Sequence, residues 1–233
     1  DRQKIIGQLG KLRDKKFESF LVDAFISAQN EVKFWVDIQD YFIFKSLNDL
    51  IPKFSIKMDF KEIRSITEII SNIVDYKSEF TLRHSKGLSE KALLMSEFYK
   101  FDLDTKYQLG IAADLHDIGK LAISNDILDK NGKLEPFEFL EIKSHAYLTR
   151  KALENICGFE KITEWAANHH EKLNGKGYPL GKKDNELDFC SRILGCLDIY
   201  QALTEERPYR ASLSHEKSIS IMKSMSENYE IDS

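Results

Sequence analysis

Histidines are the most constraining feature of this sequence. His215 lies apart from the other five, which are His84, His116, His145, His169 and His170. A single histidine on a helix is more often a hydrogen-bonded core or surface residue than a metal ligand. Five histidines within one stretch of chain need a common explanation, and a metal site supplies one.

Two pairs of adjacent residues extend this interpretation, His116-Asp117 and His169-His170. Neighbouring side chains on a helix diverge by roughly 100°, so such pairs serve a single ion poorly. Two ions about 3.5 to 4 Å apart are served well, because adjacent side chains can address different ions and an aspartate can bridge both. The sequence therefore predicts a centre of two metal ions.

The ligand types restrict the chemistry of such a centre. Imidazole and carboxylate ligands without cysteine suit iron, manganese, zinc or nickel, and they do not select one of these metals. A bridged pair of ions favours hydrolysis, because it activates water and stabilises both oxygens of a phosphoryl transfer. The sequence contains neither a G-x-S-x-G elbow nor a G-x-x-x-x-G-K-[ST] phosphate loop, so neither of these motifs competes with hydrolysis at metals.

The composition indicates an all-α protein that can bury a full core. The 233 residues are 42% apolar, with four prolines, eleven glycines and long stretches rich in Leu, Ile, Lys and Glu. Basic and acidic residues are interspersed and the formal net charge is −4, so duplex nucleic acid is not an expected partner. No apolar run reaches the roughly 18 residues that span a bilayer, so we expect no membrane segment.

Three cysteines, Cys157, Cys190 and Cys196, form no C-x-x-C pair. An odd number without this spacing predicts neither a disulfide framework nor a thiolate zinc site, and it fits the reducing cytoplasm. Because the chain starts without Met, an upstream sensor domain is compatible with it. A homodimer is compatible with it as well.

The first part of the chain is expected to form a small helical extension over residues 1–58. Apolar residues from Phe17 to Ala28 recur at helical spacing and predict a buried helix over 14–28. Pro52 interrupts the apolar pattern that follows. A second domain is expected over 59–233, beginning with an amphipathic helix that Asp59 caps.

The histidines fall on the helices predicted for this second domain. Residues 84–98 and 106–118 read as helices, and Gly119 is expected to end the second one. Pro136 is placed to open a helix that runs to about Gly158 with His145 near its middle. Residues 174–185 have the composition of a loop, and apolar helical spacing resumes over 193–203.

Three motifs in this second domain resemble those of a known protein family. LHDIGK at 115–120, HHEKLNGKGYP at 169–179 and RPYR at 207–210 resemble the HD-GYP family of bacterial cyclic di-GMP phosphodiesterases. DYKSEFTLRHS at 75–85, EIKSHAYLT at 141–149 and ILGCLDIYQALT at 193–204 are similar to its other metal-binding motifs. The resemblance covers about 65–215, and FWVDI at 34–38 resembles an extension found ahead of this domain in some members.

The resemblance implies an HD-type helical bundle and a specific set of functional residues. The metal ligands would be His84, His116, Asp117, His145, His169, His170 and Asp198. Asp117 would bridge the ions and take part in catalysis, and Lys120 would contact a substrate phosphate and support catalysis. The remaining substrate contacts would come from Gly175, Gly177, Tyr178, Pro179, Arg207 and Arg210. Cyclic di-GMP would be opened to linear pGpG or degraded further to GMP.

Several positions depart from the family pattern. Asn174 stands where Asp is usual and Ala146 where Pro is usual, and neither change removes a ligand. Members with three metals carry a glutamate where this chain has Phe80, so two ions are expected here. Glu79 is adjacent and leaves a shifted third site open.

Other functions remain open at this stage. An HD-type hydrolase acting on another nucleotide or on a phosphomonoester would need the same ligands. A non-catalytic module that senses metal or nucleotide could keep the fold, although no ligand position is broken. Oxidation at a di-iron centre uses similar ligands, but the glycine-rich loop and the nearby Lys and Arg suit phosphates better.

Overall fold

The computed structural model describes residues 2–39, 41–50, 56–77, 84–130, 132–205 and 211–232 of the protein. Among these residues the regular structure consists of helices, with isolated bridges at Arg13–Phe17 and Asn174–Lys183 and no strand. The prediction of an all-α fold is therefore confirmed. The chain divides into two compact units, Asp1–Lys57 and Met58–Ser233. No helix in the described part has the length and apolarity needed to cross a membrane.

The described residues of the first unit form short helices, two of which meet through aromatic side chains. Its helices are α1 (Arg2–Leu12), α2 (Ser19–Ala28), α3 (Val32–Asp37) and α4 (Ile43–Leu50). The rings of Phe25, Phe34 and Trp35 pack edge to face, with centroids 5.4 to 6.4 Å apart. Such edge-to-face contacts favour a defined packing of α2 against α3.

The helix predicted over 14–28 is shorter and less buried than expected. It begins at Ser19, because residues 14–17 form a turn in which Asp14 has a φ of 55°. Within α2 only Val22 is buried, while Phe20 is 67% exposed. The predicted buried face was therefore wrong: Phe20 and Leu21, which belong to that face, are exposed, whereas the buried Val22 does not belong to it.

The second unit begins with helices that carry recognisable start signals. Asp59 caps α5 (Phe60–Asp75) by accepting a hydrogen bond from the backbone N–H of Glu62, and Glu62 accepts one from Asp59 in return. Such a capping box satisfies two backbone donors that a helix start leaves free. Pro136 opens α9 (Pro136–Leu153) as predicted, and His145 lies within this helix. The helix ends five residues before Gly158.

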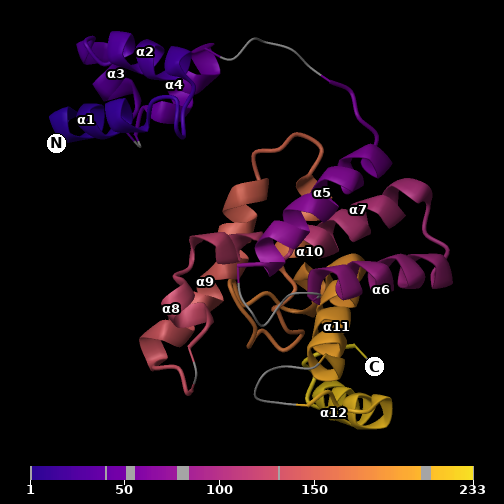
Figure 1. Ribbon diagram of the computed structural model, residues 1–233. Coiled ribbons are helices and arrows are strands. Elements are labelled where there is room, and N and C mark those ends of the chain that lie inside the picture. Colours follow the sequence, from indigo (N-terminus) through magenta and orange to yellow (C-terminus); the bar gives the residue numbers. More distant parts are fainter. Residues whose placement is uncertain are drawn as a thin grey trace. The chain divides into compact units, whose positions relative to one another are not determined.

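The other helices of this unit are α6 (His84–Phe98), α7 (Leu103–Leu115), α8 (Asn125–Leu128), α10 (Glu160–Ala167), α11 (Phe189–Thr204) and α12 (His215–Glu227), with short 3₁₀ turns at Ile118–Ala122 and Asp184–Glu186. Of these, α6, α7, α10 and α11 supply most of its buried apolar core. Within the unit, α7 contacts α5, α6 and α10, and α11 packs on α6 and α12 (Figure 1). Every residue of α7 from Leu109 to Leu115 is buried. A helix that is buried on all sides lies in the interior of a fold, so the C-terminal end of α7 lies inside the unit.

The predicted end of this central helix was wrong. The α-helix stops at Leu115, and Gly119 lies inside the following 3₁₀ turn rather than at a helix end. A Cβ atom at Gly119 would lie 2.0 Å from the carbonyl oxygen of His145 and 2.7 Å from the amide nitrogen of Thr149. Glycine is needed here because α9 crosses the turn at backbone contact distance, and helix termination is not the reason.

Candidate metal centre

The structure brings the side chains of all seven predicted ligands together. They belong to three overlapping groups whose potential ligand atoms lie within 4.8 Å of one another: His84, His116 and Asp198; His116, Asp117 and His169; and His145, His169 and His170. Six of the seven residues are buried, and His170 is partly exposed. Clustered imidazoles and carboxylates at such distances could hold metal ions, and burial shields most of these side chains from water.

Three histidines are oriented by the same local contact. Nδ1 of His116 lies 2.8 Å from the carbonyl oxygen of Ala113, and Nδ1 of His169 lies 2.6 Å from that of Ala166. His145 forms the equivalent contact with Ile142 at 2.6 Å. A neutral ring that donates from Nδ1 presents the lone pair of Nε2, which is the atom that can bind a metal. The backbone therefore directs three Nε2 atoms into the cluster.

Nε2 of His145, Nε2 of His169 and Oδ1 of Asp117 face one another as acceptors. Nε2 of His145 lies 3.3 Å from Nε2 of His169 and 3.3 Å from Oδ1 of Asp117. In the part of the chain that the structure describes, Oδ1 of Asp117 is buried without a hydrogen-bond partner. Buried acceptors that face one another are unfavourable unless a cation or a donor lies between them. This arrangement fits the divalent metal ions that the ligand types suggest.

His84 is oriented by a carboxylate instead. Its Nε2 lies 3.0 Å from Oδ1 of Asp198, and its Nδ1 lies 3.0 Å from Oε2 of Glu205 at the end of α11. A metal-binding histidine commonly donates its second ring N–H to a carboxylate, which fixes its tautomer and orientation. Asp75 supports the same region, because its carboxylate accepts from both the backbone N–H and the hydroxyl of Ser85.

Protonation of these groups follows their surroundings. Burial lowers the pKa of His170 to about 4, and burial together with the charges of His170 and His116 holds the pKa of His169 well below its usual range. Burial alone would lower the pKa of His84, but hydrogen bonds to Asp198 and Glu205 raise it to about 9. Near neutral pH His169 and His170 are therefore neutral and ready to bind a metal, whereas His84 carries a proton that a metal would displace.

Asp117 remains ionised despite its burial. Burial disfavours its charge, but the neighbouring charges of His116 and Lys120 hold the pKa of this carboxyl well below its usual range. Lys120 donates from Nζ to Oδ2 of Asp117 at 2.6 Å, and its side chain is 20% exposed. Lys120, the predicted phosphate contact, thus lies beside Asp117, the predicted bridging ligand, at the edge of the buried cluster.

A threonine on α9 fixes the turn that carries this aspartate. Thr149 donates from its hydroxyl to the carbonyl oxygen of His116 at 2.8 Å and accepts from the amide of Gly119 at 3.1 Å. The side chain is fully buried. Because α9 also carries His145, this pair of hydrogen bonds fixes the distance between ligands from two different helices.

The predicted substrate loop packs on the same cluster. The ring of Tyr178 lies 4.7 Å from the ring of His170, and its bond to Pro179 is cis. Gly175 has a φ of 74°, and a Cβ atom at Gly177 would lie 2.4 Å from the amide nitrogen of Lys172. Both glycines are therefore required by the backbone of the loop.

A glutamate that follows the double histidine anchors this loop. The carboxylate of Glu171 accepts hydrogen bonds from the amides of Leu180 at 2.7 Å and Lys182 at 3.0 Å. Glu171 itself is buried. Since it directly follows His170, the loop is tied to the residue next to the cluster.

Some predicted residues lie outside the described part of the chain. These are Arg207 and Arg210, and also Phe80 and Glu79 at the position that bears on a third metal. Sequence reasoning did not single out Glu205 or Thr149. Thr149 lies within a quoted motif, four residues after His145, but nothing local marks the partner of Glu205, because His84 lies 121 residues away.

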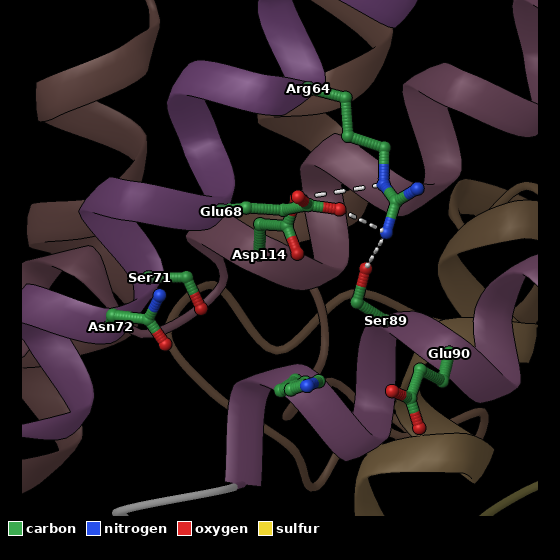
Figure 2. A pocket seen from close by; sticks show the side chains of 8 residues that line it. Arg64, Glu68, Ser71, Asn72, Ser89, Glu90 and Asp114 are labelled. Carbon is green, nitrogen blue, oxygen red and sulfur yellow. Dashed lines mark hydrogen bonds and ion pairs between the residues drawn. The ribbon is translucent and has the colours of Figure 1, made fainter.

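A polar cavity of about 210 Å³ lies between α5, α6 and α7. Figure 2 shows Arg64 reaching across it to Glu68, Asp114 and Ser89. Burial raises the pKa of Asp114 to about 6. Since none of the seven predicted ligands is among the described residues that line this cavity, it is separate from the cluster. Its polar contacts tie α5 to the end of α7 that leads to His116.

Comparisons with known proteins agree with this geometry. The family model described as HD domain matches residues 68–233. The chain is 34% identical over 224 residues to 3'3'-cGAMP-specific phosphodiesterase 1 of Vibrio cholerae, covering 95% of this chain and 52% of that protein. It is 31% identical to a cyclic di-GMP phosphodiesterase of Thermotoga maritima, covering 69% of this chain and 44% of the relative. The chain thus spans about half the length of these relatives or less.

A solved HDG"Y"P protein from Bdellovibrio bacteriovorus has a similar fold. The TM-score is 0.55 at 14% sequence identity, over 74% of this chain and 59% of the other. At this identity the likeness concerns the fold alone. It confirms the expected type of helical bundle.

Proposed function

The chain belongs to the HD domain family, and on this basis we propose that it is a metal-dependent phosphodiesterase that hydrolyses cyclic di-GMP to pGpG or onward to GMP. One observation carries the proposal: seven imidazole and carboxylate side chains converge in the core, with Oδ1 of Asp117 buried and without a hydrogen-bond partner among the described residues. The names of the relatives, which include cyclic di-GMP phosphodiesterases, support the substrate.

Two divalent transition-metal ions would be held by these seven side chains, with Asp117 between them. Iron or manganese fits the mixed nitrogen and oxygen ligands, and zinc or nickel is compatible with the same set. When bound, such a pair activates water and stabilises the charge that develops on the phosphate oxygens. His170 is the partly exposed member of the cluster, so substrate would approach from its side.

The residues around the cluster would position the phosphate. Lys120 would hold a non-bridging phosphate oxygen, because its ammonium lies at the cluster edge without being a metal ligand. Burial and the charges of Asp198 and Asp117 raise the pKa of Tyr178, so its phenol stays protonated and can donate a hydrogen bond. Arg207 and Arg210 would supply further phosphate contacts through their guanidinium groups. The three cysteines are free, which suits work in the reducing cytoplasm.

A second substrate is favoured by a specific observation. The relative that aligns with 95% of this chain is named for 3'3'-cGAMP, as is another that is 38% identical over 166 residues. Cyclic di-GMP and 3'3'-cGAMP share the ring of two phosphodiesters and differ in one base. The metal centre would cleave either, and contacts to the base would decide between them.

The deciding experiment uses protein reconstituted with manganese or with iron under reducing conditions. It is incubated in parallel with cyclic di-GMP and with 3'3'-cGAMP, and the products are separated by chromatography. We expect linear dinucleotide or mononucleotide from at least one of them, and about two metal ions per chain by elemental analysis. No cleavage of either substrate overturns the proposed function. Fewer than one ion per chain overturns the dimetal centre, and three ions would indicate a further site near Glu79.

A further inference from the structure

Lys143 lies beside the candidate centre but is not one of its ligands. It belongs to α9, two residues before His145. Its Nζ lies 4.7 Å from the ring centre of Phe139 and 5.2 Å from that of Tyr178. The Tyr178 ring in turn lies 4.7 Å from the ring of His170. The ammonium of Lys143 therefore contacts Tyr178, and Tyr178 contacts a predicted metal ligand.

In the part of the chain that the structure describes, no carboxylate is paired with Lys143. Within the residues that the structure describes, Lys143 forms no ion pair, whereas Lys120 is paired with Asp117 and Lys151 with Glu154. Lys143 is also partly buried. Contacts with aromatic faces hold an ammonium in place without cancelling its charge. The ammonium is thus held in one region and remains available to an anion.

The position of Lys143 differs from that of Lys120 in a way that matters for a substrate with two phosphates. Lys120 contacts Asp117 directly, so it would face the reacting phosphate once the predicted ligands hold metal ions. Among the contacts of the described residues, Lys143 meets the ring of Tyr178, and that ring meets the predicted ligand His170. In a cyclic dinucleotide the second phosphate is joined to the first through a ribose, so it lies beyond the reacting phosphate rather than on it.

From this geometry we infer that Lys143 binds the second, uncleaved phosphate of a cyclic dinucleotide and thereby distinguishes such substrates from simple phosphodiesters. The inference rests on the proposed function, because it assumes that a cyclic dinucleotide is the substrate. A lysine ammonium is a compact cation with three donors. It suits the uncleaved phosphate, which has to be bound but does not react. The role is one of substrate binding and specificity.

The test compares two substrates on metal-reconstituted protein. Cyclic di-GMP has two phosphates, and bis(p-nitrophenyl) phosphate has one. For Lys143→Gln we expect the KM for cyclic di-GMP to rise about tenfold with little change in kcat, as expected for loss of a charged hydrogen bond. Hydrolysis of bis(p-nitrophenyl) phosphate and the metal content should stay at wild-type values. Lys143→Arg, which keeps the charge, should retain most of the affinity for cyclic di-GMP.

A matched control is available on the same helix. Lys151 places its ammonium 5.4 Å from the ring of Tyr147, in a similar cation–π contact, and it is paired with Glu154. Lys151→Gln should change neither substrate's kinetics. This control separates loss of a helix-surface cation from loss of a substrate contact.

The outcomes separate this inference from the function on which it rests. Wild-type protein that cleaves bis(p-nitrophenyl) phosphate but neither cyclic di-GMP nor 3'3'-cGAMP overturns the proposed function, and the role of Lys143 falls with it. Wild-type protein that cleaves cyclic di-GMP, together with an unchanged KM in Lys143→Gln, overturns the role of Lys143 alone. Equal losses on both substrates would also overturn it, since they would indicate a general effect on the centre.

Discussion

Nδ1 of His84 lies 3.0 Å from Oε2 of Glu205, so the first residue of α6 is hydrogen-bonded to the residue that ends α11. This contact leaves Nε2 of His84 facing Asp198 at 3.0 Å. Glu205 is not among the predicted ligands, yet it determines which ring nitrogen of His84 faces the cluster. The carboxylate–histidine pair therefore belongs to the architecture of the proposed metal centre.

The first prediction concerns this pair. Glu205→Ala should weaken metal binding by about tenfold to a hundredfold, because His84 loses the partner that fixes its tautomer. Glu205→Gln should lose less metal affinity, since its amide oxygen can still accept a hydrogen bond from Nδ1 of His84. The measurement is a manganese titration against a competing chelator. Glu216→Ala, which removes an exposed carboxylate in the first turn of α12, is the control. Equal affinities in all variants would mean that Glu205 has no part in the centre.

The second prediction concerns the proposed bridge. Asp117→Ala should abolish hydrolysis and lower the metal content below two ions per chain, because two neighbouring cations would lose the carboxylate between them. Folding should survive, and circular dichroism of the helices tests this. Asp126→Ala, at an exposed aspartate of α8, should leave both quantities unchanged. Wild-type turnover in Asp117→Ala would make Asp117 a structural residue.

The third prediction separates phosphate binding from metal binding at Lys120. Lys120→Ala should lower kcat/KM for cyclic di-GMP by about tenfold to a hundredfold, the value of one charged hydrogen bond. Metal content should be retained, since removing a cation next to Asp117 does not weaken the attraction of metal ions to this site. Lys133→Ala, at an exposed residue, serves as the control. Loss of metal from Lys120→Ala would show that Lys120 supports the centre instead.

The two arginines should behave differently from Lys120 in the same assay. Arg207→Ala and Arg210→Ala should mainly raise the KM, because guanidinium groups are expected to bind phosphate oxygens without taking part in the reaction. Unchanged kinetics in Lys120→Ala and in both arginine variants would mean that the substrate binds elsewhere.

Local signals in the sequence predicted local structure well. Asp59 and Pro136 open their helices as expected, because capping and proline placement depend on neighbouring residues. Gly119 was misread because its requirement is tertiary: the carbonyl of His145, from another helix, occupies the space of a Cβ atom. Helical spacing over 14–28 predicted a buried face with Phe20 and Leu21, but these residues are exposed and Val22 is buried instead, because burial depends on tertiary packing.

The same distinction applies to the candidate site. Motifs on the chain marked the seven side chains that the structure brings together, because each motif places a histidine or aspartate at a recognisable position. Glu205 lies just outside the quoted motifs, and Lys143 lies within the motif at 141–149 but was not singled out. Their importance comes from side chains distant in sequence, His84 for Glu205 and Tyr178 for Lys143, and only the packed structure pairs them.

The fourth prediction tests the close approach at Gly119. Gly119→Ala should lower the free energy of unfolding by about 2 kcal/mol or more, because backbone atoms of α9 must move to admit the methyl group. Metal affinity should fall as well, since the turn carries Asp117. Gly7→Ala, at a helical glycine with open space around it, should not destabilise the protein. Thermal and denaturant unfolding of the three proteins decide the matter, and wild-type stability of Gly119→Ala would refute the backbone contact.

The last prediction concerns the pH dependence of stability at the helix that precedes the double histidine. Glu164 of α10 is paired with Arg150 and Lys182, and Asn168, which directly precedes His169, donates to it at 3.1 Å. The hydrogen bond from Arg150, opposed by burial and aided by Lys182, lowers the pKa of Glu164 to about 2. A carboxyl with a lowered pKa in the folded state stabilises the protein above its unfolded pKa of about 4.5, and this contribution disappears as the pH falls towards 2.

Wild-type protein should therefore be more stable than Glu164→Gln at neutral pH, and the difference should shrink between about pH 4.5 and 2. Because the Glu164 side chain is 42% exposed, solvent screening makes the difference smaller than the full pKa shift implies. Denaturant unfolding of both proteins across this range, in the presence of a chelator to remove metal effects, measures the difference directly. Glu227→Gln, at an exposed residue of α12, is the control, and a difference that stays constant down to pH 2 would contradict the assignment.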